Sequence, residues 1–398
     1  MLARSLAALT APVVLASGAH AQWTVTNLHP VGSTFSIASD AAGNQQVGEA
    51  LIGGIFRACT WNGDADSWID LAPAGAIDSR AYATSGTQQV GSATIDGFTR
   101  AGIWYGTAAS WLSLHPAGAA FSRALATSGT QQVGSARVSG IDRASLWSGT
   151  PESWTTLHPP IASYSEAWGI SGSQQVGLVT IGGVSHASLW RGSALSWTSL
   201  HPTGATGSLA FGTSGTQQVG SVDNGGTTHA SLWTGSAASW VNLNPADSEY
   251  SVAYATTGTQ QVGVAVIEGV SRASLWSGTA ESWVDLTTFL TGTWAETGAL
   301  SIWTDGTTIH IAGYGVESKT GNLQALLWTF TPPPCTADYN GAGDAGDIVD
   351  FLDFMDDFGT CQGQPSPCGT LGNPDLNGDT VVDIVDFLDF MDAFGTGC

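Results

Sequence analysis

Oxygen-bearing side chains near the C-terminus have the spacing of ligands for a calcium ion. Loop positions 1, 3, 5, 9 and 12 hold Asp375, Asn377, Asp379, Asp383 and Asp386, and position 7 holds Val381, whose backbone carbonyl would complete the set. This pattern is that of a calcium-binding loop. The segment that follows carries Ile384, Phe387, Leu388 and Met391 on one stripe of a predicted helix. The sequence therefore predicts calcium as a cofactor.

An earlier loop repeats this pattern less completely. Its candidate ligands are Asp338, Asn340, Asp344, Asp347 and Asp350. Ala342 stands at position 5, and one residue is inserted before Asp347, so Asp344 would have to supply the missing oxygen. Both loops run into the same ten residues, Asp-Ile-Val-Asp-Phe-Leu-Asp-Phe-Met-Asp, at 347–356 and 383–392. This duplication predicts a small domain of two loop–helix units.

A second group of chemically active side chains recurs once per repeat in the rest of the chain. It comprises Arg57, Arg100, Arg143, His186, His229 and Arg272, with Gln324 at the seventh position. Strand alternation places each on the same face as a Trp four residues later. One interpretation is that these side chains pack on the Trp or pair with a nearby acid. The other is a ring of donors that binds an anionic or sugar ligand.

Other candidate chemistry is weaker. A Leu-His-Pro motif carries His29, His115, His158 and His201, but other repeats have Ala72, Asn244 or Thr287 at this position, so a turn-capping role is predicted. Most Trp residues follow the repeat and predict core packing. Three that do not, Trp168, Trp294 and Trp303, are better candidates for ligand contact. No phosphate loop, Ser-His-Asp arrangement or clustered carboxylate pair stands out.

The elements that must position these residues follow from a 43-residue repeat. Gln-Gln-Val-Gly recurs at 45–48, 88–91, 131–134, 174–177, 217–220 and 260–263, with a degenerate copy at 311–313. Each unit holds four short β segments separated by Gly turns. The last segment of the seventh unit is missing, and its match stands at the other end of the chain, from Trp23 to Leu28. This displacement predicts an all-β, seven-bladed propeller closed by the N-terminal strand; an open β-solenoid is the alternative.

Composition sets the boundaries of the domains. Arg4, an apolar segment and Ala19-His20-Ala21 predict a signal peptide over 1–21, so the protein is expected to be secreted or attached to the cell surface. The propeller is predicted at 22–330, a Pro-rich linker at 331–334 and the duplicated domain at 335–398, which contains 13 Asp and no Lys or Arg. The formal charge of −22 argues against nucleic acid as a partner. No later segment has the roughly 20 apolar residues of a membrane span.

The repeat resembles a known family. The segments Gly183 to Trp190 (GVSHASLW) and Gly226 to Trp233 (GTTHASLW) are similar to HAF-type repeats of extracellular bacterial proteins, with Ser188 and Ser231 in place of the family's Phe. The resemblance implies an extracellular propeller and no particular activity.

The duplicated tail resembles dockerin modules, and Gly397-Cys398 resembles the GC-type dockerins of planctomycete-like bacteria. Dockerins bind cohesins, so the resemblance implies a cohesin-like partner, but Ile384 and Val385 replace the polar recognition pair, which argues against it. Four cysteines allow three pairings. The preferred one, Cys335 with Cys361 and Cys368 with Cys398, closes each unit; Cys59 is expected to be a buried free thiol.

These features lead to one main functional prediction and two alternatives. The main prediction is a non-catalytic binding or scaffold protein whose propeller recognises a surface protein or glycan and whose tail anchors or assembles it with calcium. The alternatives are a carbohydrate-active enzyme, glycosidase or lyase, and a structural surface-layer component.

Overall fold

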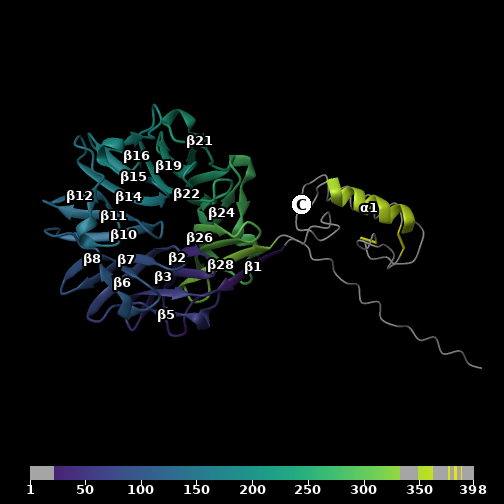
Figure 1. Ribbon diagram of the computed structural model, residues 1–398, viewed down its shortest axis with the longest axis horizontal. Helices are drawn as coiled ribbons and strands as arrows, with labels where there is room; N and C mark the ends of the chain where they lie inside the picture. The colour runs from purple at the N-terminus through teal and green to yellow at the C-terminus, as the bar shows by residue number, and fades with distance from the viewer. Residues whose placement is uncertain (1–21, 332–347, 362–374, 377–380, 383–386, 388–398) are drawn as a thin grey trace, which may run out of the picture. The chain divides into compact units, whose positions relative to one another are not determined.

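The computed structural model describes residues 22–331, 348–361, 375–376, 381–382 and 387. It divides into two compact units, one spanning Trp23–Thr331 and one that includes Pro332–Cys398. The first unit consists of seven four-stranded antiparallel sheets arranged as the blades of a β-propeller (Figure 1).

The first four blades follow the chain order from the innermost to the outermost strand. Blade one comprises β2 (Ser36–Ala42), β3 (Gln45–Ile52), β4 (Ile55–Trp61) and β5 (Ile69–Asp70). Blade two comprises β6 (Ala76–Thr84), β7 (Gln89–Ile95), β8 (Phe98–Trp104) and β9 (Leu112–Ser113). Blade three comprises β10 (Phe121–Thr127), β11 (Gln132–Val138), β12 (Ile141–Trp147) and β13 (Thr155–Thr156). Blade four comprises β14 (Tyr164–Ser171), β15 (Gln174–Ile181), β16 (Val184–Trp190) and β17 (Thr198–Ser199).

The last three blades continue around the ring. Blade five comprises β18 (Gly207–Thr213), β19 (Gln218–Asn224), β20 (Thr227–Trp233) and β21 (Val241–Asn242). Blade six comprises β22 (Ser248–Thr256), β23 (Gln261–Ile267), β24 (Val270–Trp276) and β25 (Val284–Asp285). Blade seven comprises β26 (Trp294–Thr304), β27 (Ile309–Glu317) and β28 (Leu323–Thr331), and its outermost strand is β1 (Gln22–Asn27). Short 3-10 turns η1 to η6 precede the outermost strands of blades one to six, at Ala65–Ser67, Ala108–Ser110, Pro151–Ser153, Ala194–Ser196, Ala237–Ser239 and Ala280–Ser282, and η7 spans Leu286–Phe289.

The pairing of β1 with β28 confirms the closed ring predicted from the displaced N-terminal strand. Leu28 continues this pairing, because its N–H donates to the carbonyl of Ala325 at 2.9 Å. The last blade is therefore built from both ends of the propeller sequence, and the solenoid alternative is wrong.

The repeated residues hold neighbouring blades together. A buried Trp lies on the third strand of every blade, at its last residue in blades one to six, and fills the space between blades; these are Trp61, Trp104, Trp147, Trp190, Trp233, Trp276 and Trp328. One hydroxyl residue on each innermost strand, which we call the serine position, accepts a hydrogen bond from a backbone N–H of the preceding blade. The serine position comprises Ser36, Ser79, Ser122, Ser165, Ser208, Ser251 and Thr297, and its bonds are 2.8–2.9 Å long.

The Gln-Gln-Val-Gly motif also joins blades. Gln88 Oε1 accepts from the hydroxyl of Thr127 at 2.7 Å and from the amide of Gln132 at 2.9 Å, both in the next blade. The Gly of the motif is required by close packing inside a blade, because a Cβ at Gly134 would lie 2.0 Å from the carbonyl oxygen of Arg123. The motif is therefore structural.

The second unit contains α1 (Ile348–Cys361). Its Phe354 and Phe358 pack with Cys361 and with Val382 from the later loop. No helix among the described residues is both long and apolar enough to cross a membrane.

Most of the predicted ligands of the two calcium loops, and Cys335, Cys368 and Cys398, lie outside the described residues. Within those residues, no three His, Cys, Asp or Glu side chains cluster as a metal site. Calcium binding therefore stays a prediction.

Candidate functional site: the axial channel

The innermost strands of the seven blades surround a central channel, and each strand carries a β-bulge there. The register shifts between Ala124 and Ala126 in β10, so that Leu125 is the extra residue, and the same shift occurs at the matching place in every other blade. A bulge redirects its extra side chain. The bulge residues, which we call the bulge layer, are Ser39, Tyr82, Leu125, Trp168, Phe211, Tyr254 and Leu300.

Aromatic rings of the bulge layer contact one another around the channel. Trp168 and Phe211 stack with centroids 4.7 Å apart and planes 11° apart, and Phe211 meets Tyr254 edge-on at 5.3 Å. Of the three off-pattern Trp residues, Trp168 is the one that lines the channel pocket. Trp294 and Trp303 are not among the residues that line it.

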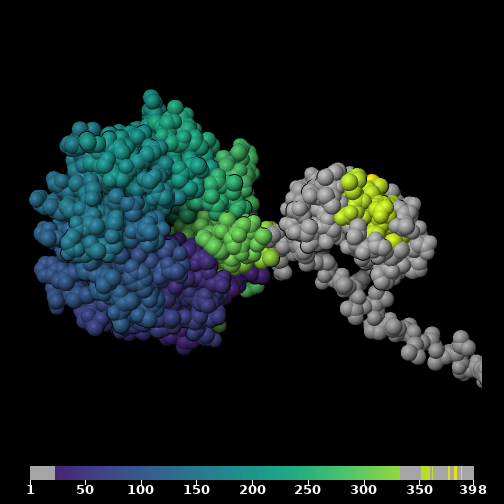
Figure 2. Space-filling model, in the orientation of Figure 1, coloured from purple at the N-terminus to yellow at the C-terminus, as the bar shows by residue number. Residues whose placement is uncertain are grey.

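On one side of the bulge layer lies a pocket of about 240 Å³ lined by all seven innermost strands. Its wall includes the residue after each bulge residue, which we call the aspartate level: Asp40, Ala83, Ala126, Gly169, Gly212, Ala255 and Ser301. Asp40 is the one titratable residue at this level. Figure 2 shows one face of the propeller, with the blades packed around a central depression.

Asp40 connects three blades. One carboxylate oxygen accepts from the hydroxyl of Ser301 in blade seven, and the other accepts from the N–H of Thr84 in blade two at 2.8 Å. Burial raises the pKa of Asp40 to about 6, against the opposing effect of these hydrogen bonds. Its carboxyl group can therefore change protonation close to neutral pH.

On the other side of the bulge layer, charged residues occupy the innermost strands of blades two, three and four. This set, the arginine level, comprises Ile37, Arg80, Arg123, Glu166, Leu209, Val252 and Gly298, each two residues before its bulge residue. Arg80 contacts Glu49 of blade one, with its Nη1 3.3 Å from Oε1, and its guanidinium lies 4.5 Å from the ring centroid of Phe56. Burial raises the pKa of Glu49 to about 7, although Arg80 acts to lower it.

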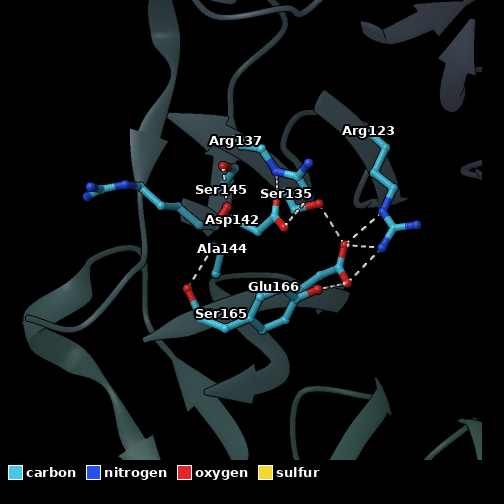
Figure 3. A network of polar contacts seen from close by, with 10 residues as sticks. Arg123, Ser135, Arg137, Asp142, Ala144, Ser145, Ser165 and Glu166 are labelled. Atoms are coloured by element: carbon cyan, nitrogen blue, oxygen red, sulfur yellow. Dashed lines mark hydrogen bonds and ion pairs between the residues drawn. The ribbon is translucent and has the colours of Figure 1, made fainter. Parts of the chain in front are cut away.

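Glu166 is held differently from Glu49. Arg123 grips its carboxylate with two hydrogen bonds of 2.8 and 2.9 Å (Figure 3). The hydroxyl of Ser135 donates to the same carboxylate at 2.6 Å, and that of Tyr164 donates at 3.0 Å. Glu166 is 2 % exposed. Four donors thus occupy this carboxylate, which leaves Glu49 as the less engaged of the two acids.

Sequence reasoning missed these acids because the repeats hide them. Glu49 replaces a Ser that stands at Ser92, Ser135 and Ser221 in other blades, and it pairs across the sheet with Ile37. Glu166 replaces an apolar residue or an Arg. Comparison of the repeats position by position, with attention to substitutions that add a charge, is the signal that finds both.

The predicted cationic ring lies away from the channel, on the third strand of each blade. Arg57 and Arg272 pair with Asp70 and Asp285 of the outermost strands at 2.6 and 2.8 Å. The Nδ1 of His186 lies 3.3 Å from the Ser199 hydroxyl.

The rest of the ring follows the same strand. The Nδ1 of His229 is 3.2 Å from the Asn242 amide, and Gln324 accepts from Asn27 at 2.5 Å. Arg100 and Arg143 occupy the equivalent positions of β8 and β12. None of these residues lines the channel pocket.

The histidines of the Leu-His-Pro motif stabilise turns through side-chain contacts. The Nδ1 of His115 is 2.8 Å from the hydroxyl of Ser122, and its Nε2 is 3.0 Å from the carbonyl oxygen of Ala119. His29, His158 and His201 make the same two contacts in their blades. Cys59 is buried and free, as predicted.

No protein-family model and no curated protein matches the chain. Among solved structures, a puromycin hydrolase variant is similar with a TM-score of 0.51 and 13% identity, over 73% of this chain and 53% of that one. An acylaminoacyl peptidase is similar with a TM-score of 0.51 and 11% identity, over 74% and 51%. The chain therefore spans about half the length of each of these enzymes.

The β-propeller domain of the Trilobed protease from Pyrococcus furiosus has a TM-score of 0.50 and 10% identity, over 74% of this chain and 94% of that one. That domain has an open velcro topology, whereas β1 closes the ring here.

These similarities contradict the main functional prediction, a non-catalytic binding or scaffold protein, because the similar propellers belong to hydrolases and peptidases. The prediction treated a sevenfold ring as scaffold alone, and it missed the charged residues on β3 and on the innermost strands of blades two to four. At this level of identity the comparisons establish the fold, and the chain is a seven-bladed β-propeller.

Proposed function

We propose that the protein is a carbohydrate-active enzyme of the lyase type, which cleaves an acidic polysaccharide at the arginine level of the channel. The observation that carries the proposal is the Glu49–Arg80 pair. A carboxyl group with a pKa raised to about 7 stands on β3 beside a cation from the innermost strand of the next blade, at a position where three other blades have Ser.

Glu49 has the properties of a general base. A catalytic acid or base works best when its pKa is near the working pH, and burial brings Glu49 into that range. Its side chain is 10 % exposed, so it is largely withdrawn from bulk water. Its contact with Arg80, at 3.3 Å, is longer than the bonds that hold Glu166, so a substrate can displace it more easily.

Arg80 and Arg123 supply positive charge for a uronate. Their side chains are 35% and 36% exposed, so each can contact a ligand. Tyr82, which lines the channel pocket, lies within electrostatic reach of Arg80, Arg123 and Glu49. A guanidinium that pairs with the uronate carboxylate stabilises the charge that develops on it during elimination.

The reaction is a β-elimination. Glu49 takes the proton from the carbon next to the uronate carboxylate, and the electron pair of that C–H bond forms a carbon–carbon double bond. The glycosidic C–O bond on the neighbouring carbon breaks, the leaving oxygen takes a proton from the solvent, and Glu49 returns its proton to the solvent. The products are one new chain end and one unsaturated uronate, with no water consumed.

A glycosidase is less favoured by this geometry. Glycoside hydrolysis generally uses two available carboxyl groups, one as acid and the other as base or nucleophile. The carboxylate of Glu166 is occupied by Arg123, Ser135 and Tyr164, so Glu49 is the single available acid of the pair. A single base beside cations fits elimination better than displacement.

The proposal is tested by incubating the purified full chain with polygalacturonate, alginate and a neutral xylan. We expect new chain ends and the ultraviolet absorbance of the unsaturated product with an acidic substrate, and neither with xylan. Chain ends without absorbance would overturn the lyase assignment in favour of hydrolysis. Absence of cleavage in all three would overturn the proposal.

Variants locate the activity. Glu49→Ser introduces the residue that other blades carry, so the fold should tolerate it, and we expect the rate to fall by about 10²–10⁴. Arg80→Gln should chiefly raise KM for the acidic substrate. Arg137→Gln removes a cation of similar chemistry whose ion pair with Asp142 lies on β11 and β12, and it is the matched control. Equal loss in all three variants would refute the site.

From the sequence alone we further propose that the protein is exported and that its tail binds calcium through the loop from Asp375 to Asp386. Calcium loops lose their structure when their ions are removed. EDTA should therefore lower the melting temperature of the tail and excess calcium should restore it, while an unchanged melting curve would refute the proposal.

A further inference from the structure

The pocket on the aspartate side of the bulge layer is bordered by backbone donors. The residue after the aspartate level in each blade is Ala41, Thr84, Thr127, Ile170, Thr213, Thr256 or Ile302. In blade three, Thr127 lies opposite Gln132. The neighbouring pair, Ser128 and Gln131, is a hydrogen-bonded pair, because the N–H of Ser128 donates to the carbonyl of Gln131 at 2.9 Å. Hydrogen-bonded pairs alternate in antiparallel sheets, so the N–H of Thr127 points away from β11, toward the channel.

Side chains cap two of these seven N–H groups. Asp40 accepts from Thr84 at 2.8 Å, and the Ser301 hydroxyl accepts from Ala41 at 3.4 Å. Ala or Gly stands at the aspartate level beside the other five, at Ala83, Ala126, Gly169, Gly212 and Ala255, so those N–H groups have no side-chain acceptor among the described residues. The two capped positions show that these N–H groups can donate to a carboxylate and to a hydroxyl oxygen.

The charge pattern selects the class of ligand. A cation would be repelled by the N–H dipoles that converge on the pocket, although Asp40 would attract it. An anion would be attracted by those dipoles and repelled by Asp40. A neutral polyol meets both demands, because each hydroxyl can accept from an N–H and donate to the carboxylate. The aromatic rings of Trp168 and Phe211 can pack against the apolar face of a sugar.

We infer that this pocket is a binding site for one neutral sugar residue. Its volume of about 240 Å³ is below the roughly 300–1,000 Å³ of clefts that hold drug-sized ligands, which limits the occupant to a single ring. The site is separate from the proposed lyase centre. Glu49 lies opposite Ile37 in the sheet, and Asp40 comes three residues after Ile37 on the same strand. At about 3.3 Å per residue the two levels are roughly 10 Å apart along the strand.

The test is ligand-observed NMR and calorimetry on the full chain with glucose, galactose and mannose, beside glucosamine as the cationic probe and glucuronate as the anionic one. We expect at least one neutral sugar to bind in the millimolar range or better and more tightly than both charged probes. Tighter binding of glucosamine or of glucuronate would overturn the inference. Failure of every neutral sugar to bind at tens of millimolar, roughly the weakest affinity calorimetry detects, would also overturn it.

Two variants use residues that other blades already tolerate. Asp40→Ala copies Ala83 and should weaken sugar binding about tenfold or more, because it removes a charged acceptor. Trp168→Leu copies Leu125 and should also weaken it. Asp247→Ala, at an exposed turn, is the control and should leave binding unchanged. Wild-type affinity in Asp40→Ala would refute the site.

The variant Glu49→Ser separates this inference from the proposed lyase activity. It should abolish cleavage and leave sugar binding intact, so that either claim can fail alone.

Discussion

At the scale of single residues, two acids stand apart from the repeat and make the stability of the propeller depend on pH. Burial raises the pKa of Asp40 to about 6 and that of Glu49 to about 7, from 3.8 and 4.5. Between its ordinary and its folded pKa, each acid binds more protons in the folded state than in the unfolded state. Their contribution to the free energy of unfolding is thus complete below about pH 4 and is lost as the pH rises through 6 to 7.

We therefore expect Glu49→Gln to reduce the pH dependence of stability. Between about pH 5 and about pH 8 the wild type should lose more free energy of unfolding than the variant, because the neutral amide has no proton to lose. Urea unfolding at both values measures the difference. Asp247→Asn, at an exposed position, should follow the wild type. Parallel losses in wild type and Glu49→Gln would show that the folded pKa of Glu49 is not raised.

At the scale of elements, the serine position ties each innermost strand to the preceding blade. The Oγ of Ser122 accepts from the buried N–H of Ala101 at 2.9 Å and lies 2.8 Å from Nδ1 of His115. Ser122→Ala should lower the free energy of unfolding by about 1–3 kcal/mol, because a buried N–H loses its acceptor. Urea unfolding measures this loss, and Ser148→Ala, at an exposed turn, is the control. Losses of equal size in both variants would contradict this role.

The same elements show why the sequence predicted the blades but not the channel chemistry. Repetition every 43 residues reveals strands, turns and the buried Trp, since those features must recur in each blade. The bulge at Leu125 has no distinctive composition: it follows an Ala and precedes another Ala, and it was visible only in the register of β10 with β11. Because the equivalent bulge in blade one decides how the residues around Ser39 face the channel, Asp40 was not recognised as part of a site. Trp168 was recognised as a candidate, because it is a Trp that does not follow the repeat.

At the scale of the whole molecule, the ring is closed by a strand that is held without a covalent hairpin. Each of the other six blades receives its outermost strand from the chain that has just left the third strand. Blade seven receives β1 from the opposite end of the propeller sequence. Non-covalent contacts of Leu28 and of β1 with β28 must therefore hold this strand in place, whereas a short chain connection holds the outermost strand of the other blades. We expect the ring to open first at this junction.

A pair of equivalent variants tests that expectation. Leu28 and Leu71 occupy the same position in successive repeats, and both are fully buried. Each Leu→Ala change should cost about 2–5 kcal/mol by leaving a cavity.

Hydrogen exchange followed by mass spectrometry should then differ between the two variants. Leu28→Ala should speed exchange across β1 and β28 through opening of the ring, because β1 can leave while the other blades stay folded. Leu71→Ala should raise exchange only slightly and locally around β5, since the chain still connects that strand to β4. The expectation would be wrong if the two variants showed the same hydrogen-exchange protection, in β1 and β28 for Leu28→Ala and in β4 and β5 for Leu71→Ala. Closure by the N-terminal strand would then not be the weakest point of the ring.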